Sequence, residues 1–230
     1  MKRLSHILRL LPAVLLTASC TADKGMAEEA PHSNGTVSEG SNLYTAIVTV
    51  KKSPSDTVYF QLNDSVTVYP VNYQGKYSAM ERVICEARVK NAATGSYPYT
   101  CSVNWLEALD TGIVTSDKSI KGDDGIDIIE DWMTSVEDGY LTLHYTCWWG
   151  TAPVQHSFIL VTGTNPSDPY EVELRHNAGG DGKDTKGDSL VCFDINSLPD
   201  TGGSYKTLTL KWTTSGGSAS EKAFRFKTRE

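Results

Sequence analysis

Apolar and polar residues alternate along most of the chain from Leu43 onward, which is the pattern of half-buried β-strands. The segment 82–89 shows this well, because four apolar residues share one face: Val83, Cys85, Ala87 and Val89. Ile84 breaks the pattern, since it is apolar but lies among the charged residues of the opposite face. Alternation of this kind predicts antiparallel sheets with one buried and one solvated face.

The predicted strands form two blocks, so we expect an all-β protein with two domains. The first block, 43–112, holds strands predicted at 44–50, 57–62, 65–69, 82–89 and 99–109. Five strands in about 70 residues favour a small barrel of the oligonucleotide/oligosaccharide-binding (OB) type. The second block, 113–230, has short strands predicted at 126–129, 141–147, 156–161, 170–176, 189–195, 205–212 and 223–227. That spacing favours an immunoglobulin-like β-sandwich, with at most one helical turn at 130–138.

The segment 1–19 has the three-part layout of a secretory signal peptide. Three basic residues open it, an apolar run covers 10–16, and small residues fill 17–19. The apolar run is much shorter than the ~20 residues that a membrane-spanning helix needs. We therefore expect export and removal of this segment.

Cys20 stands where the cleavage site should be, and Leu16–Cys20 resembles a bacterial lipobox. Thr17 occupies the position where the commonest lipobox has Leu, so an ordinary signal peptide cut near Ser19 is the alternative. A lipobox predicts acylation of Cys20, palmitate included, and anchoring in the cell envelope, in the outer membrane rather than the inner one. The segment 20–42 is small, polar and punctuated by Gly and Pro, which predicts a flexible tether.

Charge excludes one class of partner. Removing residues 1–19 takes away three basic residues and no acidic one, so the net charge falls from −7 to −10. Binding of a phosphate backbone needs clustered Lys and Arg, so we expect no nucleic-acid partner.

Four cysteines follow Cys20. The alternation places Cys85 and Cys101 on the apolar faces of their strands, which allows a disulfide between them or two small buried side chains. Cys147 lies on the core side of its strand, whereas Cys192 alternates against its apolar neighbours and should point away from that core. No spacing matches a zinc motif, so the sequence predicts neither a metal nor a cofactor.

No catalytic motif is recognisable, so we expect a non-enzymatic protein. His144, His156 and His176 belong to predicted strands and are interpreted as hydrogen-bonded structural residues. The acidic loop 181–188 departs from the ligand pattern of calcium loops and contains two Lys, which favours a solvated turn. A second acidic cluster, in 123–138, is interpreted as a solvated face.

Trp148 and Trp149 are adjacent on a predicted strand, so one should face the core and the other the solvent. The alternation assigns Trp149 to the core and Trp148 to the outer face. An exposed Trp148 could anchor a protein or glycan partner or cover a loop as a rim residue.

The order of several short segments resembles the NigD-like lipoproteins of Bacteroidetes. These segments are Asp131-Trp132-Met133, Tyr140–Tyr145, His156 with Leu160-Val161, Leu174–Asn177 and Asp181. The resemblance covers nearly the whole chain after the signal, implies an OB-type domain before a β-sandwich, and suggests a bacteriocin-immunity-like role. It implies no catalytic residue. The alternatives are a glycan-binding accessory lipoprotein and, with least support, an envelope hydrolase.

Overall fold

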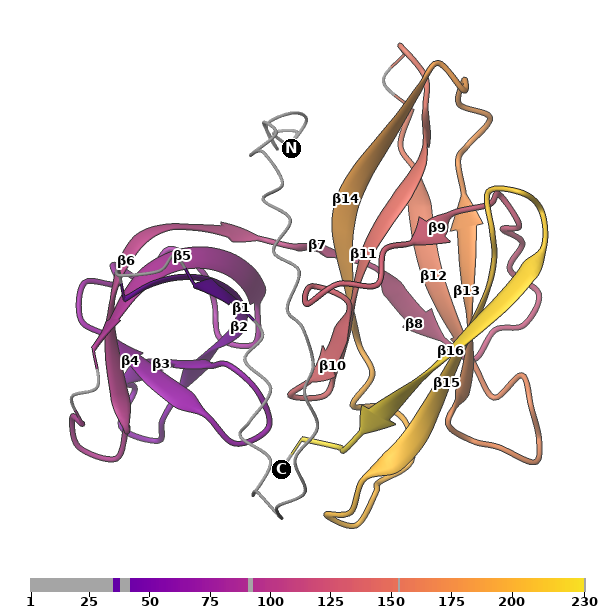
Figure 1. Ribbon diagram of the computed structural model, residues 1–230. Helices are drawn as coiled ribbons and strands as arrows, with labels where there is room; N and C mark the ends of the chain where they lie inside the picture. The colour runs from indigo at the N-terminus through magenta and orange to yellow at the C-terminus, as the bar shows by residue number, and fades with distance from the viewer. Residues whose placement is uncertain (1–34, 38–41, 91–92, 153, 230) are drawn as a thin grey trace, which may run out of the picture. The chain divides into compact units, whose positions relative to one another are not determined.

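The computed structural model describes residues 35–37, 42–90, 93–152 and 154–229. Within those ranges every regular element is a β-strand, which confirms the predicted all-β class (Figure 1). No helix in the described residues is long and apolar enough to cross a membrane. The predicted signal peptide, Cys20 and the predicted tether up to residue 34 lie outside the described residues. Residues 35–37, which also belong to the predicted tether 20–42, form a short paired strand, so the prediction of a flexible tether is wrong for them.

Five strands close into the predicted barrel: β2 (Leu43–Lys52), β3 (Val58–Gln61), β4 (Thr67–Pro70), β5 (Arg82–Lys90) and β6 (Tyr99–Ala108). Their order is β2-β3-β4-β6-β5, and the pairing of β2 with β5 closes the ring. Every pair is antiparallel except β4 with β6, and the short β1 (Gly35–Val37) pairs with β2 at the edge. Val48, Val83, Cys85 and Cys101 are among the residues that fill the interior, and for Val83, Cys85 and Cys101 this is the face that the alternation predicted.

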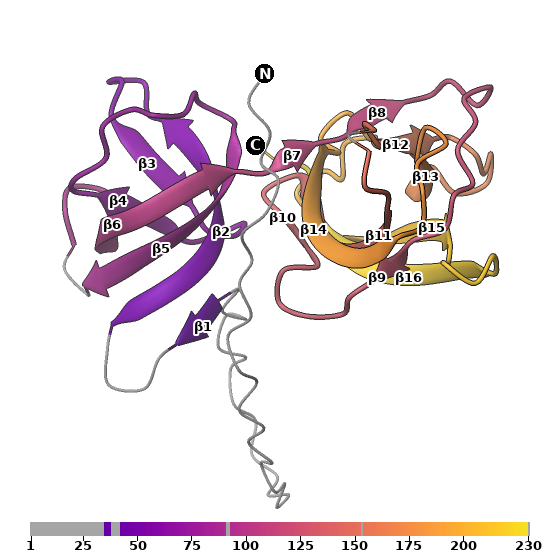
Figure 2. The same cartoon turned by 90° about the horizontal axis from the view of Figure 1, so that it is seen from above.

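Two five-stranded sheets form the predicted sandwich, seen end-on in Figure 2. The first sheet holds β7 (Asp110–Thr111), β9 (Asp127–Ile128), β10 (Ser135–Glu137), β11 (Tyr140–Trp149) and β14 (Thr185–Asp194). The second sheet holds β8 (Ile113–Thr115), β12 (Ser157–Thr162), β13 (Glu171–Asn177), β15 (Lys206–Thr213) and β16 (Ala219–Phe226). Residues of both sheets, among them Leu143, Leu160, Phe193 and Leu210, make one fully buried core.

The short strands β7 and β8 were not predicted, because they lie in the turn-rich stretch after residue 109. β7 pairs in parallel with β14, and β8 pairs in parallel with β12, so Gly112 lies where the chain passes from one sheet to the other. The domain boundary at 112/113 remains a prediction.

The single helical turn predicted at 130–138 is wrong. That segment contains β10, which forms a hairpin with β11 through Asp138 and Gly139. Both residues have positive φ, +52° and +70°, as the two-residue type I′ turn requires. The Asp-Gly pair is the sequence signal for this hairpin.

A third apolar cluster explains two features of the sequence pattern. Ile84, the residue out of alternation, packs on the outside of the barrel in a cluster with Ile47, Leu109 and Cys192. Cys192 points away from the sandwich core, as predicted, and is nevertheless buried in this cluster. The outer faces of β5 and β14 are therefore not simply solvated, and the apolar residues on them have partners.

Candidate functional site

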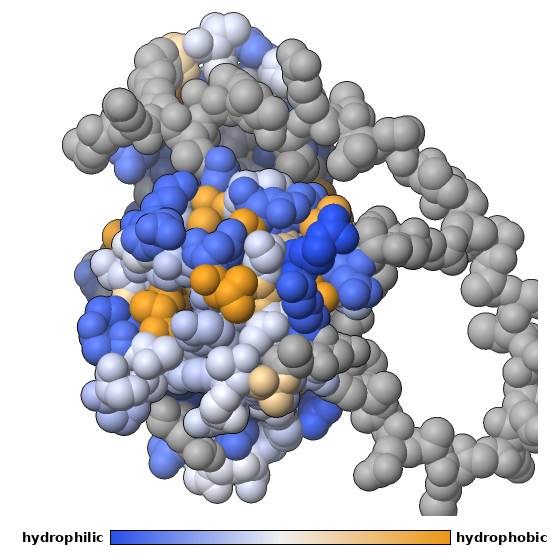
Figure 3. All heavy atoms as spheres, turned by 90° about the vertical axis from the view of Figure 1, so that its left-hand side faces the viewer, coloured by the Kyte–Doolittle hydropathy of each residue, from blue (hydrophilic) through white to orange (hydrophobic). Residues whose placement is uncertain are grey.

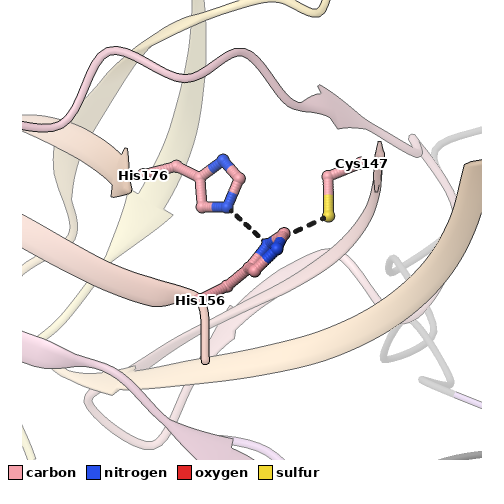
Figure 4. A group of neighbouring side chains, drawn as sticks. All are labelled: Cys147, His156 and His176. Atoms are coloured by element: carbon pink, nitrogen blue, oxygen red, sulfur yellow. Dashed lines mark hydrogen bonds between the residues drawn. The ribbon is translucent and has the colours of Figure 1, made fainter. Parts of the chain in front are cut away.

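Three potential ligand side chains meet at one end of the sandwich (Figure 4). Cys147 lies near the end of β11, His156 directly precedes β12, and His176 lies near the end of β13. β12 and β13 are antiparallel, with Phe158 opposite His176, so the start of one strand adjoins the end of the other. The hairpin register thus brings together residues that are far apart in the sequence.

The inner atoms of the three side chains converge. His156 Nδ1 lies 3.0 Å from His176 Nε2 and 3.8 Å from Cys147 Sγ. All three potential ligand atoms lie within 4.8 Å of one another. Cys147 has no exposed surface, and the two histidines are buried. The cluster is therefore an internal polar site within an otherwise apolar region.

The outer nitrogen of each imidazole faces a different acceptor. His156 Nε2 lies 3.1 Å from the Asp181 carboxylate, in a contact where the two side chains are 1 % and 3 % exposed. His176 Nδ1 lies 3.2 Å from the backbone carbonyl oxygen of Asp124. These acceptors fix the orientation of both rings.

Aromatic rings pack against both imidazoles and hold them in place. Trp149 stacks on His156 with ring centroids 4.2 Å apart, and Phe158 stacks on His176 at 4.6 Å. Trp149 is partly buried against the sandwich core, as the alternation predicted. Each imidazole has one face covered by an aromatic ring and its outer nitrogen in contact with an acceptor, so neither imidazole can turn without disturbing its neighbours.

The loop after β11 is built around Asp181. Its carboxylate accepts hydrogen bonds from the backbone N–H groups of Gly150 and Gly182, both at 2.8 Å. A Cβ at position 150 would come within 3.0 Å of the Asp181 carboxylate carbon and within 2.7 Å of Gly182 N, so only glycine fits here. The acidic loop thus caps backbone groups of the 148–156 segment and is more than the solvated turn expected.

The protonation chemistry of the site follows from its burial. Loss of hydration, with a smaller effect of Asp181, raises the pKa of Cys147 to about 12. Burial, and then proximity to His156, lowers the pKa of His176. The pKa of Asp181 is lowered, chiefly by the N–H of Gly150. The Cys147 thiol is therefore protonated near neutral pH and is not a nucleophile in this state.

The predicted partner-binding residue, Trp148, lies apart from this cluster on the outer face of β11. It is 38 % exposed and pairs in register with Lys186 of β14. Lys186 in turn forms an ion pair with Asp127 at 2.6 Å. On the same outer face His144 lies between the carboxylates of Asp131 and Asp188, at 2.8 and 3.1 Å, which agrees with its structural interpretation.

Cys85 and Cys101 are free thiols in the barrel core. In the β5–β6 register Cys85 lies opposite Leu106, and Cys101 opposite Val89, so the two cysteines do not face each other. The two cysteines are therefore separate, small buried side chains, which was the second of the two interpretations, and they do not form a disulfide.

Sequence reasoning missed the convergence of Cys147, His156 and His176. Each residue fell in a predicted strand, but no short spacing joined them. The available signal was their position: the end of one strand, the start of the next, and the end of the third. In an up-and-down arrangement such positions lie at one end of the sheets.

A comparison with curated proteins gave no match. Among solved structures, a protein from Parabacteroides distasonis named as a candidate toxin-related protein is 26 % identical, with a TM-score of 0.67 over 80 % of this chain and 93 % of that one. A NigD-like immunity protein from Bacteroides caccae is 17 % identical (TM-score 0.57; 80 % and 96 % covered). A candidate lipoprotein from Bacteroides fragilis is 11 % identical (TM-score 0.58; 82 % and 100 % covered).

The second and third of these structures share the fold at low identity. The family model of the NigD-like C-terminal beta sandwich domain matches residues 109–226, just over half of the chain. This match covers all strands of the sandwich from β7 to β16, including the three residues of the buried cluster. The protein belongs to the NigD-like family.

Proposed function

We propose that this protein is a lipid-anchored cell-envelope lipoprotein that binds a protein partner without catalysing a reaction. The leader ending at Cys20 supports the anchor, and a candidate lipoprotein among the structures of the same fold is consistent with it. The immunity protein from Bacteroides caccae supports a proteinaceous toxin as the partner. Acyl chains in the outer membrane would hold the two folded domains at the end of the segment that joins Cys20 to β1.

The observation that carries the proposal is the exposure of Trp148. An indole that is 38 % exposed on a rigid strand offers a large contact area at little cost in conformational entropy. The neighbouring Lys186–Asp127 ion pair supplies polar groups at the edge of such a contact. Figure 3 shows a different face, on which small hydrophobic patches are separated by hydrophilic residues, so no broad apolar area is visible there.

A glycan-binding accessory role is the second candidate, and a group of tyrosines on the barrel favours it. Tyr97 packs between Tyr59 and Tyr69, with ring centroids 5.3 and 5.8 Å apart. Aromatic rings can stack on sugar faces. Sugar-dependent quenching of intrinsic fluorescence that is lost in Tyr97→Ala would support this role.

The anchor is tested by labelling cells with a palmitate analogue. The wild-type protein should be labelled and should fractionate with membranes, whereas Cys20→Ala should be unlabelled. Mass spectrometry of the native protein should find acylated Cys20 as the first residue. An intact Met1, or an unmodified thiol at position 20, would contradict the proposal.

The partner surface is tested by placing a photo-crosslinking amino acid at position 148 in living cells. Position 205 serves as the control, because Tyr205 is also exposed, at 47 %, but lies in another part of the sandwich. A discrete protein adduct at 148 that is absent at 205 supports the proposal, and its mass spectrum identifies the partner. No adduct at 148, or the same adducts at both positions, refutes Trp148 as the anchor.

A further inference from the structure

We propose that Cys147, His156 and His176 form a buried binding site for one borderline-soft transition-metal ion of the zinc and copper class. The site is separate from the surface around Trp148 and does not depend on the proposed partner. Three observations support it: the balance of donors and acceptors, the separation of the ligand atoms, and the contacts behind the ligands.

The first observation concerns hydrogen-bond donors. The Asp124 carbonyl can only accept, so His176 Nδ1 must donate to it. The Asp181 carboxylate already accepts from Gly150 N–H, so His156 Nε2 donates to it. A neutral imidazole carries one N–H, so the single N–H of each histidine is already donated to the acceptor that faces away from the other ligands. The inner nitrogens, His156 Nδ1 and His176 Nε2, are left as two lone pairs facing each other across 3.0 Å.

Two facing lone pairs repel each other unless a proton or a metal ion lies between them. The thiol of Cys147 can donate one proton to His156 Nδ1, but that leaves His176 Nε2 without a donor. A metal ion satisfies both nitrogens and the sulfur at once. On binding, the thiol loses its proton to solvent, a sulfur–metal bond forms, and the thiolate offsets part of the ion's charge.

The second observation concerns distance. Zinc takes His nitrogen at about 2.0 Å and Cys sulfur at about 2.3 Å, so neighbouring ligand atoms of a tetrahedral site lie about 3.3–3.6 Å apart. The observed 3.0 Å between the nitrogens and 3.8 Å between Cys147 Sγ and His156 Nδ1 lie on either side of that separation. The third pair lies within 4.8 Å, so these two atoms must approach each other by up to about 1.3 Å to complete the site.

The third observation concerns the contacts behind the ligands. Metal-bound histidines normally donate their other N–H to a carboxylate or a backbone carbonyl, and both arrangements occur here, at Asp181 and at Asp124. One thiolate and two imidazoles select zinc or copper, because calcium and magnesium prefer oxygen ligands. The three ligands come from β11, the start of β12 and β13, so a bound ion would join both sheets of the sandwich.

The site lies beneath Trp149 and the loop that Asp181 caps, which indicates that the ion enters during folding. The test therefore uses the full chain, both as isolated from its host without chelator and after refolding with Zn²⁺ or Cu⁺. Elemental analysis should find about one ion per chain, and the element found distinguishes zinc from copper. Cys147→Ser and His176→Gln should each lose most of that metal.

Matched controls lie elsewhere in the same chain. Cys85→Ser changes another buried free cysteine, and His144→Gln another buried histidine between acceptors; both should keep the metal. A chelator present during refolding should lower the melting temperature of the wild type and leave that of Cys147→Ser unchanged. This comparison remains informative if a variant is less stable.

Refolding with Co²⁺ gives a direct view of the ligands. The wild type should show a thiolate-to-cobalt charge-transfer band, and Cys147→Ser should not. Wild-type protein that is metal-free as isolated and takes up no zinc, copper or cobalt on refolding overturns the proposal. Metal that persists in the Cys147→Ser/His176→Gln double variant also overturns it, because the ion is then bound elsewhere.

Discussion

Replacing Gly112 with alanine tests whether the crossing between the two sheets is as tightly packed as the structure indicates. A Cβ at this position would lie within 2.8 Å of three atoms of the Phe193 ring. Phe193 is fully buried in the sandwich core, and the N–H of Gly112 donates to the carbonyl of Cys192 at 2.9 Å. Neither the ring nor the backbone can therefore move away freely.

The magnitude follows from two opposing effects. Carbon atoms in contact normally lie about 3.5–4.0 Å apart, so the ring or the backbone must shift by about 1.5 Å to clear the nearest ring atom. Overpacking of this kind costs about 1–3 kcal/mol. Alanine also reduces the entropy of the unfolded chain, which returns about 0.4–1 kcal/mol. We expect the free energy of unfolding to fall by about 1–2 kcal/mol.

The assay is urea denaturation followed by tryptophan fluorescence, since only Trp105 of the five tryptophans lies in the barrel. Gly216→Ala is the control, because the nearest atom to its added Cβ is 3.8 Å away. In a Phe193→Leu background, Gly112→Ala should cost less, with a coupling energy of at least about 0.5 kcal/mol. Strict additivity, or equal effects of the two glycine substitutions, would refute the reasoning.

Two further predictions concern ion pairing and thiol reactivity. Lys51→Met should lower the free energy of unfolding by about 2 kcal/mol, because Asp138, whose side chain is 5 % exposed, loses its partner at 2.6 Å. Lys52→Met, which breaks an exposed pair, should change it by less than about 0.5 kcal/mol, and denaturant titration separates the two cases. Burial raises the pKa of Cys85 to about 12 and that of Cys101 to about 11, so alkylation of the native protein should be negligible at pH 8 and should rise with pH. Rapid modification of either thiol at pH 8, mapped by mass spectrometry, would show that the barrel core is open.

Alternation was sufficient to predict the strands that have one apolar face. It placed Val83 and Cys85 of β5 and Cys101 of β6 on the inward faces of their strands, and it placed Cys192 on the face opposite the sandwich core. It could not show that this opposite face is also buried, because the partner residues Ile47 and Ile84 belong to a distant part of the chain. Ile84 was the visible sign that the outer face of β5 has an apolar partner.

The site was harder to predict than the fold. Cys147, His156 and His176 have no metal-motif spacing, and each one fits the periodicity of its own strand. Their convergence depends on the β12–β13 register and on which end of β11 faces that hairpin, and a single sequence specifies neither. The missed strand β10 had a different cause, since the Asp138-Gly139 turn signal was present and was passed over for a helical turn.

The parallel strands β7 and β8 also affect how this protein can be divided. Cutting the chain after β8 would remove an edge strand from each sheet of the sandwich. Any cut between the barrel and the sandwich would also separate Ile47 and Ile84 from Cys192. A recombination event that separated the halves would thus leave two damaged products. We expect the barrel and the sandwich to be inherited as one unit, and that any successful truncation will keep residues 109–115 with the C-terminal half.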